Sequence, residues 1–345
     1  MNSGAIFRLF VLSAALLANS VWAQNSSTQL QSSDRKRADI VMTDLEPVLD
    51  GILDDEIWQQ ATVINDLHQT TPVDMGEPSQ RSEFYVTYSE DYFYVAARLY
   101  DTEPELISAR QMIQGGQTNF DDFAFVMLDT FNNNRTGFHF QTNPNGMRSE
   151  SVYENPSSQN WDWSGIWQSA SNIDEEGWTM EIAIPFTTLN FNPNTDTWGF
   201  NVGRDISRTN EEIAWSSFNR NANPSTSGLI SGINGIQQGL GLDVVPSVTV
   251  AEETNHTVND SEGRFDPSLD IFYKFTPNLT GALTFNTDFS ATEADSRQVN
   301  FSRFGLFFEE KRDFFLQDSE IFSFGDLSGG GFGSSSNGMP FYSRR

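Results

Sequence analysis

Short aromatic and β-branched segments recur through the middle of the chain, and they constrain its fold more than any other feature. The clearest pair is SEFYVTY at 82–88 and YFYVAARLY at 92–100, which a Ser-Glu-Asp turn joins as a hairpin. Further segments of this kind follow at 122–129, 136–142, 147–153, 166–172, 177–184 and 197–206. Strands this short and this closely spaced predict an all-β domain, a jelly-roll-like β-sandwich over residues 40–241.

The first 23 residues have the pattern of a secretory signal peptide. Arg8 precedes a short apolar run at 9–17, and Val21-Trp22-Ala23 forms a small-x-small cleavage site. The apolar run is too short for a membrane anchor. Residues 24–39 are polar and then basic, which predicts a flexible leader. Export without cysteine suits the periplasm or outer membrane of a Gram-negative bacterium, where we expect the protein.

Charge and composition exclude several classes of function. The chain carries 20 Lys and Arg against 47 Asp and Glu, a formal net charge of −27. This balance argues against nucleic-acid binding, because phosphate contacts need clustered basic side chains. The absence of cysteine excludes thiol catalysis, and no HExxH, Walker A, Rossmann or G-x-S-x-G motif occurs. We expect no cofactor, apart from a structural Ca²⁺ that Asp and Asn oxygens could hold.

The residues from 242 to 345 form a second region with a different pattern. Apolar Leu283 and Phe285 alternate with polar Thr284 and Asn286, so a strand at 280–289 has one apolar face. A strand of about ten residues with one apolar face is typical of a transmembrane β-strand, and an exposed hairpin is the alternative. The acidic stretch at 251–266 is expected to be a loop, and a Phe-rich stretch follows at 299–324. We expect the first strands of a β-barrel domain, and therefore contact with the outer membrane.

A tryptophan-rich loop is the main candidate for a binding site. Trp161, Asp162 and Trp163 lie between stretches of Asn, Ser and Gln. A sugar ring has an apolar C–H face and a rim of hydroxyls, so it needs an aromatic platform bordered by polar side chains. Exposed Trp161 and Trp163 would supply that platform. The alternative is that one of them packs into the edge of the sandwich.

Charged side chains near the later strands allow two interpretations. Arg204 lies inside a predicted strand and needs a partner if it is buried. Pairing with a carboxylate inside the fold is the structural interpretation, and recognition of a ligand at a cleft is the functional one. Glycoside hydrolysis needs two carboxyls at a set separation in space, which adjacency in the sequence does not reveal.

Several ordered motifs resemble the family 9 carbohydrate-binding module. They are LDGILDDEIWQQA at 49–61, EFYVTYSEDYFYVAARLYD at 83–101, DDFAFVMLD at 121–129, GWTMEIAIPFTTL at 177–189 and TWGFNVGR at 197–204. The form is similar to the one that begins a group of bacterial envelope proteins whose C-terminal region is a domain of unknown function. Segments 268–289 and 299–324 resemble the start of that region, so we expect this chain to be part of a longer protein.

The resemblance implies a non-catalytic domain that binds saccharide or polysaccharide, beside machinery for polysaccharide degradation or uptake. Any hydrolase activity would then arise by association. Paired tryptophans sandwich a terminal sugar in such modules, which makes Trp161 and Trp163 the candidate pair, and hydrogen bonds are expected from Asp162, Asn160, Arg204 and Glu150. Two alternatives stay open: an outer-membrane transport or assembly protein whose sandwich contacts other proteins, and a glycoside hydrolase.

Overall fold

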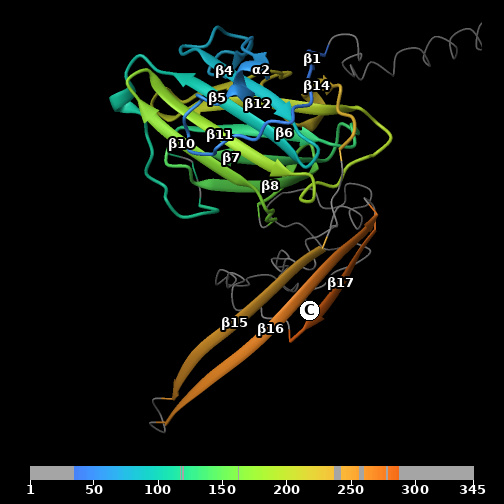
Figure 1. Ribbon diagram of the computed structural model, residues 1–345. Helices are drawn as coiled ribbons and strands as arrows, with labels where there is room; N and C mark the ends of the chain where they lie inside the picture. The colour runs from blue at the N-terminus through green and yellow to red at the C-terminus, as the bar shows by residue number, and fades with distance from the viewer. Residues whose placement is uncertain are drawn as a thin grey trace, which may run out of the picture. The chain divides into compact units, whose positions relative to one another are not determined.

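The computed structural model describes residues 35–116, 118, 120–161, 163–236, 242–255, 260–276 and 279–286. The predicted signal peptide, Asp162 and the stretch at 299–324 lie outside the described residues. Two sheets form the predicted β-sandwich, and the three strands that follow it form a sheet of their own (Figure 1). The prediction of an all-β sandwich is therefore confirmed.

The larger sheet of the sandwich has nine strands. Seven follow one another in the order β1-β14-β12-β6-β7-β8-β9, while β13 pairs with β12 and with β3. Their bounds are β1 Arg37–Asp39, β3 His68–Thr71, β6 Phe123–Asp129, β7 Gly137–Thr142, β8 Arg148–Asn155, β9 Ser158–Asn160, β12 Thr197–Ile206, β13 Glu211–Ala214 and β14 Gly228–Ser231. Strand β1 corrects the predicted leader at 24–39, because its residues pair in parallel with β14.

The smaller sheet has five strands in the order β10-β11-β5-β4-β2. Their bounds are β2 Thr62–Ile64, β4 Ser82–Tyr88, β5 Tyr92–Tyr100, β10 Gln168–Asp174 and β11 Gly177–Pro185. The predicted hairpin at 82–100 is present as β4 and β5. The strands that the sequence pattern missed, such as β2, β3 and β13, have only three or four residues, too few to show an alternation.

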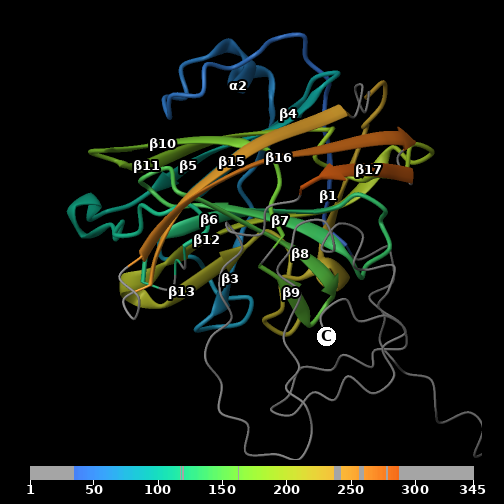
Figure 2. The ribbon, with the colours of Figure 1, turned by 90° about the horizontal axis from the view of Figure 1, so that it is seen from below.

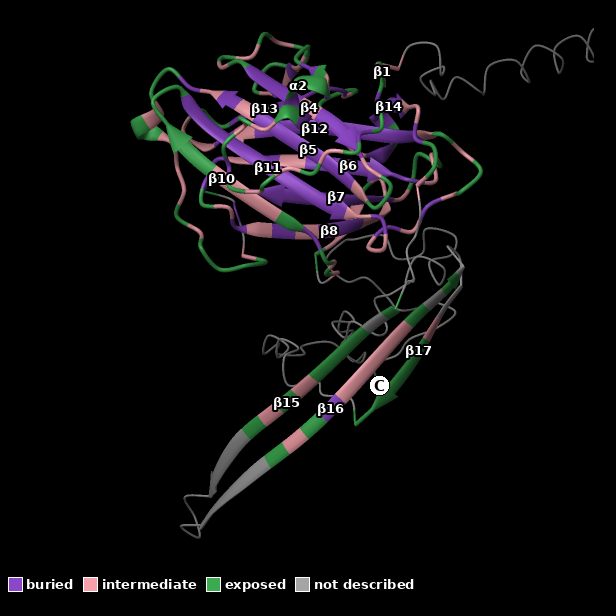
Figure 3. Cartoon of the chain, viewed as in Figure 1, coloured by how far each residue is buried: buried purple, intermediate pink, exposed green. Residues whose placement is uncertain are grey.

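The core lies between these two sheets, where alternate residues of each central strand meet. Strands β6 and β12 contribute Ala124, Val126, Leu128, Trp198, Phe200 and Val202, all fully buried. Phe93 of β5 crosses the gap, with its ring centroid 6.2 Å from Trp198 and 6.1 Å from Phe200. Figure 3 shows burial concentrated on these central strands. Because successive side chains of a strand point to opposite faces, the residues between the core positions face outward.

A buried carboxylate fixes the segment that covers the outer face of the five-stranded sheet. Glu181 of β11 is fully buried; its Oε2 accepts hydrogen bonds from the backbone N–H groups of Asp50 (3.0 Å) and Gly51 (2.8 Å), and its Oε1 accepts one from Trp58 Nε1 (2.9 Å). Trp58 lies in the short helix α2 (Glu56–Gln60), which Figure 2 shows beyond this sheet, on the side away from β6 to β9. Burial raises the pKa of Glu181, and its three donors compensate for that burial.

The third sheet is an antiparallel meander of β15 (Leu242–Asn255), β16 (Asp260–Thr276) and β17 (Leu279–Phe285). Residues 251–255 and 260–266, predicted as a loop, continue the strands instead, because each residue pairs across the hairpin. Among the described residues the strand order of this sheet is β15-β16-β17. In that same part of the chain, none of the helices has the length and apolar character needed to cross a membrane.

Gly51 provides a test of how tightly the covering segment is held. Its φ is +85°, and a Cβ there would lie 2.6 Å from the carbonyl carbon of Ser171. We expect Gly51→Ala to lower the free energy of unfolding by about 2 kcal/mol or more, through left-handed strain and backbone overlap. Gly115→Ala is the matched control, because Gly115 has a φ of +73° with open space around it.

Urea denaturation of both variants measures the difference. The control should lose only about 1 kcal/mol, the cost of the left-handed conformation. Equal losses in the two variants would show that the covering segment can move away from β10.

Candidate functional site

A pocket of about 400 Å³ lies on the outer face of the nine-stranded sheet. Its floor comes from outward-facing residues of β6, β7, β12 and β13, and its rim from β3, β8, β9 and the loop at 220–223. Aromatic, amide and acidic side chains all contribute to its lining. The principal ones are Phe123, Phe125, His139, Gln141, Tyr153, Gln159, Trp161, Asp205, Glu212, Arg220, Asn221 and Asn223.

His139 is the centre of the aromatic part of the pocket. Its ring stacks on Phe125 (centroids 5.3 Å apart, planes 19° apart) and meets Tyr153 and Trp161 edge-on, at 6.1 Å and 5.7 Å. Burial lowers the pKa of His139 to about 4, so the imidazole is neutral at neutral pH. Trp161 is 49% exposed, and one of its faces is therefore open to a ligand.

Amide side chains supply the polar part of the pocket. Gln141 donates from Nε2 to Thr118 Oγ1 (2.9 Å), while its Oε1 lies 3.3 Å from His139 Nε2. Gln159 donates to Ser151 Oγ (3.3 Å), and Asn223 donates to the carbonyl of Pro156 (3.0 Å). These contacts orient the amides and leave further lone pairs and N–H groups for a ligand.

Two carboxylates lie side by side on the floor. Asp205 of β12 and Glu212 of β13 are register partners, so their side chains leave adjacent strands on the same face. Burial raises the pKa of Asp205 to about 7, with further contributions from the charges of Glu212 and Asp122. Both carboxylates can accept hydrogen bonds from hydroxyl groups.

The structure brings only one of the two candidate tryptophans into this pocket. Trp161 lines it, whereas Trp163 packs toward the core against Phe138 and Phe140, at centroid distances of 5.3 Å and 6.0 Å. The expected platform of Trp161 with Trp163 is therefore not formed. The chain leaves β9 at Asn160, so the strand rule that residues two apart share a face does not apply to the loop.

The other sequence candidates are distributed around the site. Asn160 donates to Glu154 Oε1 (3.3 Å), and Glu150 accepts from Ser164 Oγ (2.9 Å) and Trp167 Nε1 (3.1 Å). Neither Asn160 nor Glu150 lines the pocket. Their contacts instead fix the loop that carries Trp161, and Asp162 lies outside the described residues.

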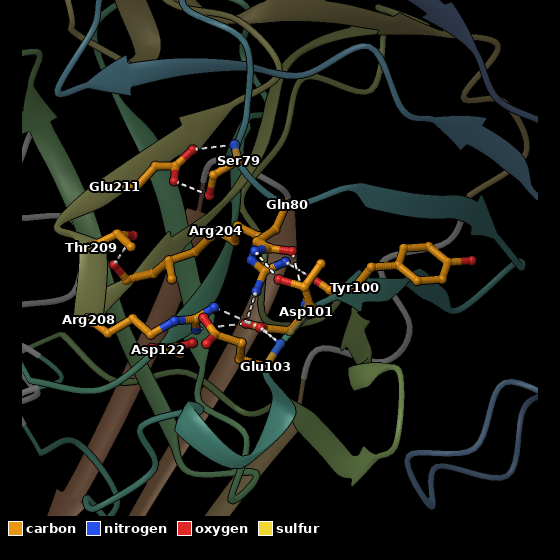
Figure 4. Close-up of polar contacts among 12 residues, drawn as sticks. Ser79, Gln80, Tyr100, Asp101, Glu103, Asp122, Arg204, Arg208, Thr209 and Glu211 are labelled. Carbon is orange, nitrogen blue, oxygen red and sulfur yellow. Dashed lines mark hydrogen bonds and ion pairs between the residues drawn. The ribbon is translucent and has the colours of Figure 1, made fainter.

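Arg204 borders the pocket through its place on β12, but its guanidinium lies on the core side. It donates to the carbonyl of Tyr100 (2.7 Å), and its Nη2 lies 3.9 Å from Asp101. Asp101 also receives two hydrogen bonds from Arg208, at 2.8 Å and 2.7 Å (Figure 4). Although burial opposes it, this pairing lowers the pKa of Asp101. Of the two interpretations of Arg204, the structure shows the internal ion pair.

For several pocket residues, the alternation in the sequence shows that they share one face of a strand. It does not show whether that face packs in the core or lines the pocket. Phe123 and Phe125 alternate with the smaller Ala124 and Val126, and this alternation permits either pair to face the core. It is the smaller residues that are buried between the sheets. His139 and Gln141 alternate with Phe138 and Phe140 on β7, the clearest polar alternation on the pocket floor.

Asp205 leads to a prediction about the pH dependence of stability. Its folded-state pKa of about 7 lies above the ordinary value of 3.8, so the folded chain holds this proton more tightly. The contribution of this proton to the free energy of unfolding is fully present below about pH 4 and is lost as pH rises through about 7. We expect Asp205→Asn to gain roughly 1–3 kcal/mol of unfolding free energy relative to wild type between pH 4 and pH 8.

Denaturant titrations of wild type and variant across this range measure the difference in the free energy of unfolding. Groups that both proteins share, such as His139, contribute equally and drop out of this difference. Glu175→Gln is the control, since Glu175 is exposed between β10 and β11. A pH-independent difference for Asp205→Asn would contradict the assignment.

Comparison with known proteins gives two family matches. Residues 49–230, just over half of the chain, match the model of the carbohydrate family 9 binding domain-like family. Residues 240–330 match a domain of unknown function, DUF5916. No curated protein matches the chain.

Two solved structures with similarity to this chain are complexes of a family 9 carbohydrate binding module from Caldicellulosiruptor kristjanssonii. The cellotriose complex is 20% identical, with a TM-score of 0.42, and the match covers 57% of this chain and 93% of that one. The glucose complex is 19% identical, with a TM-score of 0.42 and coverages of 57% and 95%. The DUF5916 region follows the sandwich within this chain. Because the first model matches residues 49–230, the chain belongs to the carbohydrate family 9 binding domain-like family.

Proposed function

We propose that this chain binds saccharide in the pocket on the outer face of the nine-stranded sheet, as a non-catalytic domain of the bacterial envelope. The observation that carries the proposal is the half-exposed Trp161 beside oriented amides and carboxylates in one cavity. Membership of a carbohydrate-binding family supports it independently.

The chemistry of the lining fits a sugar ring. The C–H face of the ring stacks on Trp161, as apolar ring faces do on exposed aromatics. Ring hydroxyls donate to Asp205 and Glu212 and exchange hydrogen bonds with Gln141 and Gln159, since amides both donate and accept. The volume of about 400 Å³ lies in the range of pockets for small ligands.

The same carboxylates argue against glycoside hydrolysis. A glycosidase places its two carboxyls on either side of the scissile bond, whereas Asp205 and Glu212 leave neighbouring strands in the same direction. They can hold a sugar from below but cannot flank one of its bonds. We therefore propose that the domain contributes to polysaccharide degradation or uptake by holding the glycan for other proteins.

Binding is tested by a glycan array, followed by calorimetric titration of the full chain with cellotriose and with glucose. Trp161→Ala should weaken binding by at least about tenfold, because it removes the stacking surface. Trp163→Phe is the control: it keeps an aromatic ring against Phe138 and Phe140 outside the pocket and should bind as wild type does. Absence of binding to every glycan, or equal affinity in Trp161→Ala, would refute the proposal.

We also propose that the chain is exported and that its C-terminal region contacts the outer membrane. Register and alternation place Val244, Val248 and Val250 of β15 on one face with Phe265 and Ile271 of β16. Val248, Val250, Leu283 and Phe285 are 58–76% exposed. The opposite face carries Asp266, Ser268 and Asp270. An apolar face this continuous is unfavourable in water and suited to lipid.

Matched arginine substitutions test which face meets lipid. Val248→Arg places a charge on the apolar face and should reduce the fraction of exported protein in outer-membrane preparations, since a lipid-facing Arg costs about 2–4 kcal/mol at the midplane. Val245→Arg is the control, because Val245 lies opposite Asp270 on the polar face. A wild-type protein recovered entirely in the soluble periplasmic fraction would contradict the proposed membrane contact.

A further inference from the structure

The pair Asp205–Glu212 is an arrangement that sheets normally avoid. The two residues are direct cross-strand partners on the pocket face, and like charges in that position destabilise an antiparallel pair. Among the described residues neither carboxylate forms an ion pair with Lys or Arg. Within the described ranges, the side-chain hydrogen bond to the pair comes from Thr70 Oγ1, 3.4 Å from Glu212 Oε2. In the part of the chain that the structure describes, the pair therefore has no Lys or Arg within salt-bridge distance, and Arg204 acts on Asp205 only through its charge.

The groups around the pair come from β6, from β12 and from the loop after β13. Phe123 of β6 is the register partner of Asp205 on its other side, and Phe125 follows on the same face. Asp122 adds a further negative charge at the start of β6. Arg204 is next to Asp205 on β12, and its guanidinium donates a hydrogen bond to the carbonyl of Tyr100 on the core side. Arg220, on the loop after β13, also lines the pocket.

A buried acceptor in the same pocket is also without a partner. His139 is 93% buried and lines the cavity, and its Nδ1 has no hydrogen-bond partner among the described residues. With its ring neutral, Nε2–H can donate to Gln141, which leaves Nδ1 as an acceptor. The carboxylate pair and this nitrogen are acceptors at the floor, whereas the buried Arg204 of the lining directs its guanidinium to Tyr100 and Asp101 on the core side.

We infer, on the basis of the saccharide binding proposed above, that this pocket selects a saccharide carrying a protonated amine, with the ammonium group held between Asp205 and Glu212. An ammonium has three donors and no acceptor, so it can bridge two carboxylates that repel each other. The rings of Phe123 and Phe125 border the position and add a cation–π contribution. Arg220 contacts sugar hydroxyls in this arrangement.

The experiment is a calorimetric titration of the full chain with three trisaccharides of one backbone geometry. These are cellotriose, the β-1,4-linked trimer of glucosamine and its fully N-acetylated form, at about pH 7, where primary amines are still largely protonated and Asp205 ionises. The glucosamine trimer should bind at least about tenfold more tightly than the other two, and the advantage should shrink as salt screens the charges. The acetylated trimer controls for the size of the nitrogen substituent.

Variants assign the selectivity to the carboxylates. Asp205→Asn and Glu212→Gln should each bring the affinity ratio of the glucosamine trimer to cellotriose close to one, whereas the exposed-site variant Glu175→Gln should keep the wild-type ratio. An additional titration with a galacturonate trimer examines the opposite charge.

The outcomes separate this inference from the proposed function. Cellotriose binding without preference for the glucosamine trimer would overturn the inference and leave saccharide binding intact. Tightest binding of the galacturonate trimer would also overturn it and would indicate recognition by Arg220. If none of the sugars binds, the inference and the proposed function fail together.

Discussion

Face-to-face packing of the two sheets is the constraint on which the rest of this structure depends. Phe93 of one sheet packs on Trp198 and Phe200 of the other, and the alternate positions of β6 and β12 fill the space beside them. Because a slip of one residue would turn every side chain to the opposite face, this packing sets the register of the central strands. It thereby also determines that Phe123, Phe125, His139 and Asp205 face outward, into the pocket.

Buried charged side chains hold further segments of the sandwich in place once that packing has formed. Glu181 anchors the turn at Asp50 and Gly51 and the indole of Trp58 on the outer side of the five-stranded sheet. Arg204 and Arg208 converge on Asp101 between the sheets (Figure 4). Removing one partner from such a group leaves an uncompensated buried charge, which is costly. The rigid scaffold that results positions the pocket floor, where Asp205 and Glu212 lie side by side.

The candidate site was only partly predictable. The polar loop with Trp161 was identified from its composition, and Trp161 does line the pocket. Trp163 has the same local sequence context but packs on Phe138 and Phe140, because the chain leaves the sheet after β9 and no periodicity relates the two side chains. Asp205 and Glu212 come together through the pairing of β12 with β13, and β13 has only four residues, too few to be recognised from sequence.

The sequence by itself determined the class of fold, the longer strands and the family, because these depend on local alternation, turn residues and ordered motifs that a single strand or hairpin carries. It also predicted one apolar face for the strand at 280–289. Tertiary structure alone decided which face of β6 is the core and which acids share the pocket. Both faces of β6 are apolar in sequence, and its burial is decided by the partner sheet. Contacts between residues far apart in the chain depend on the register of strands, which alternation within one strand does not specify.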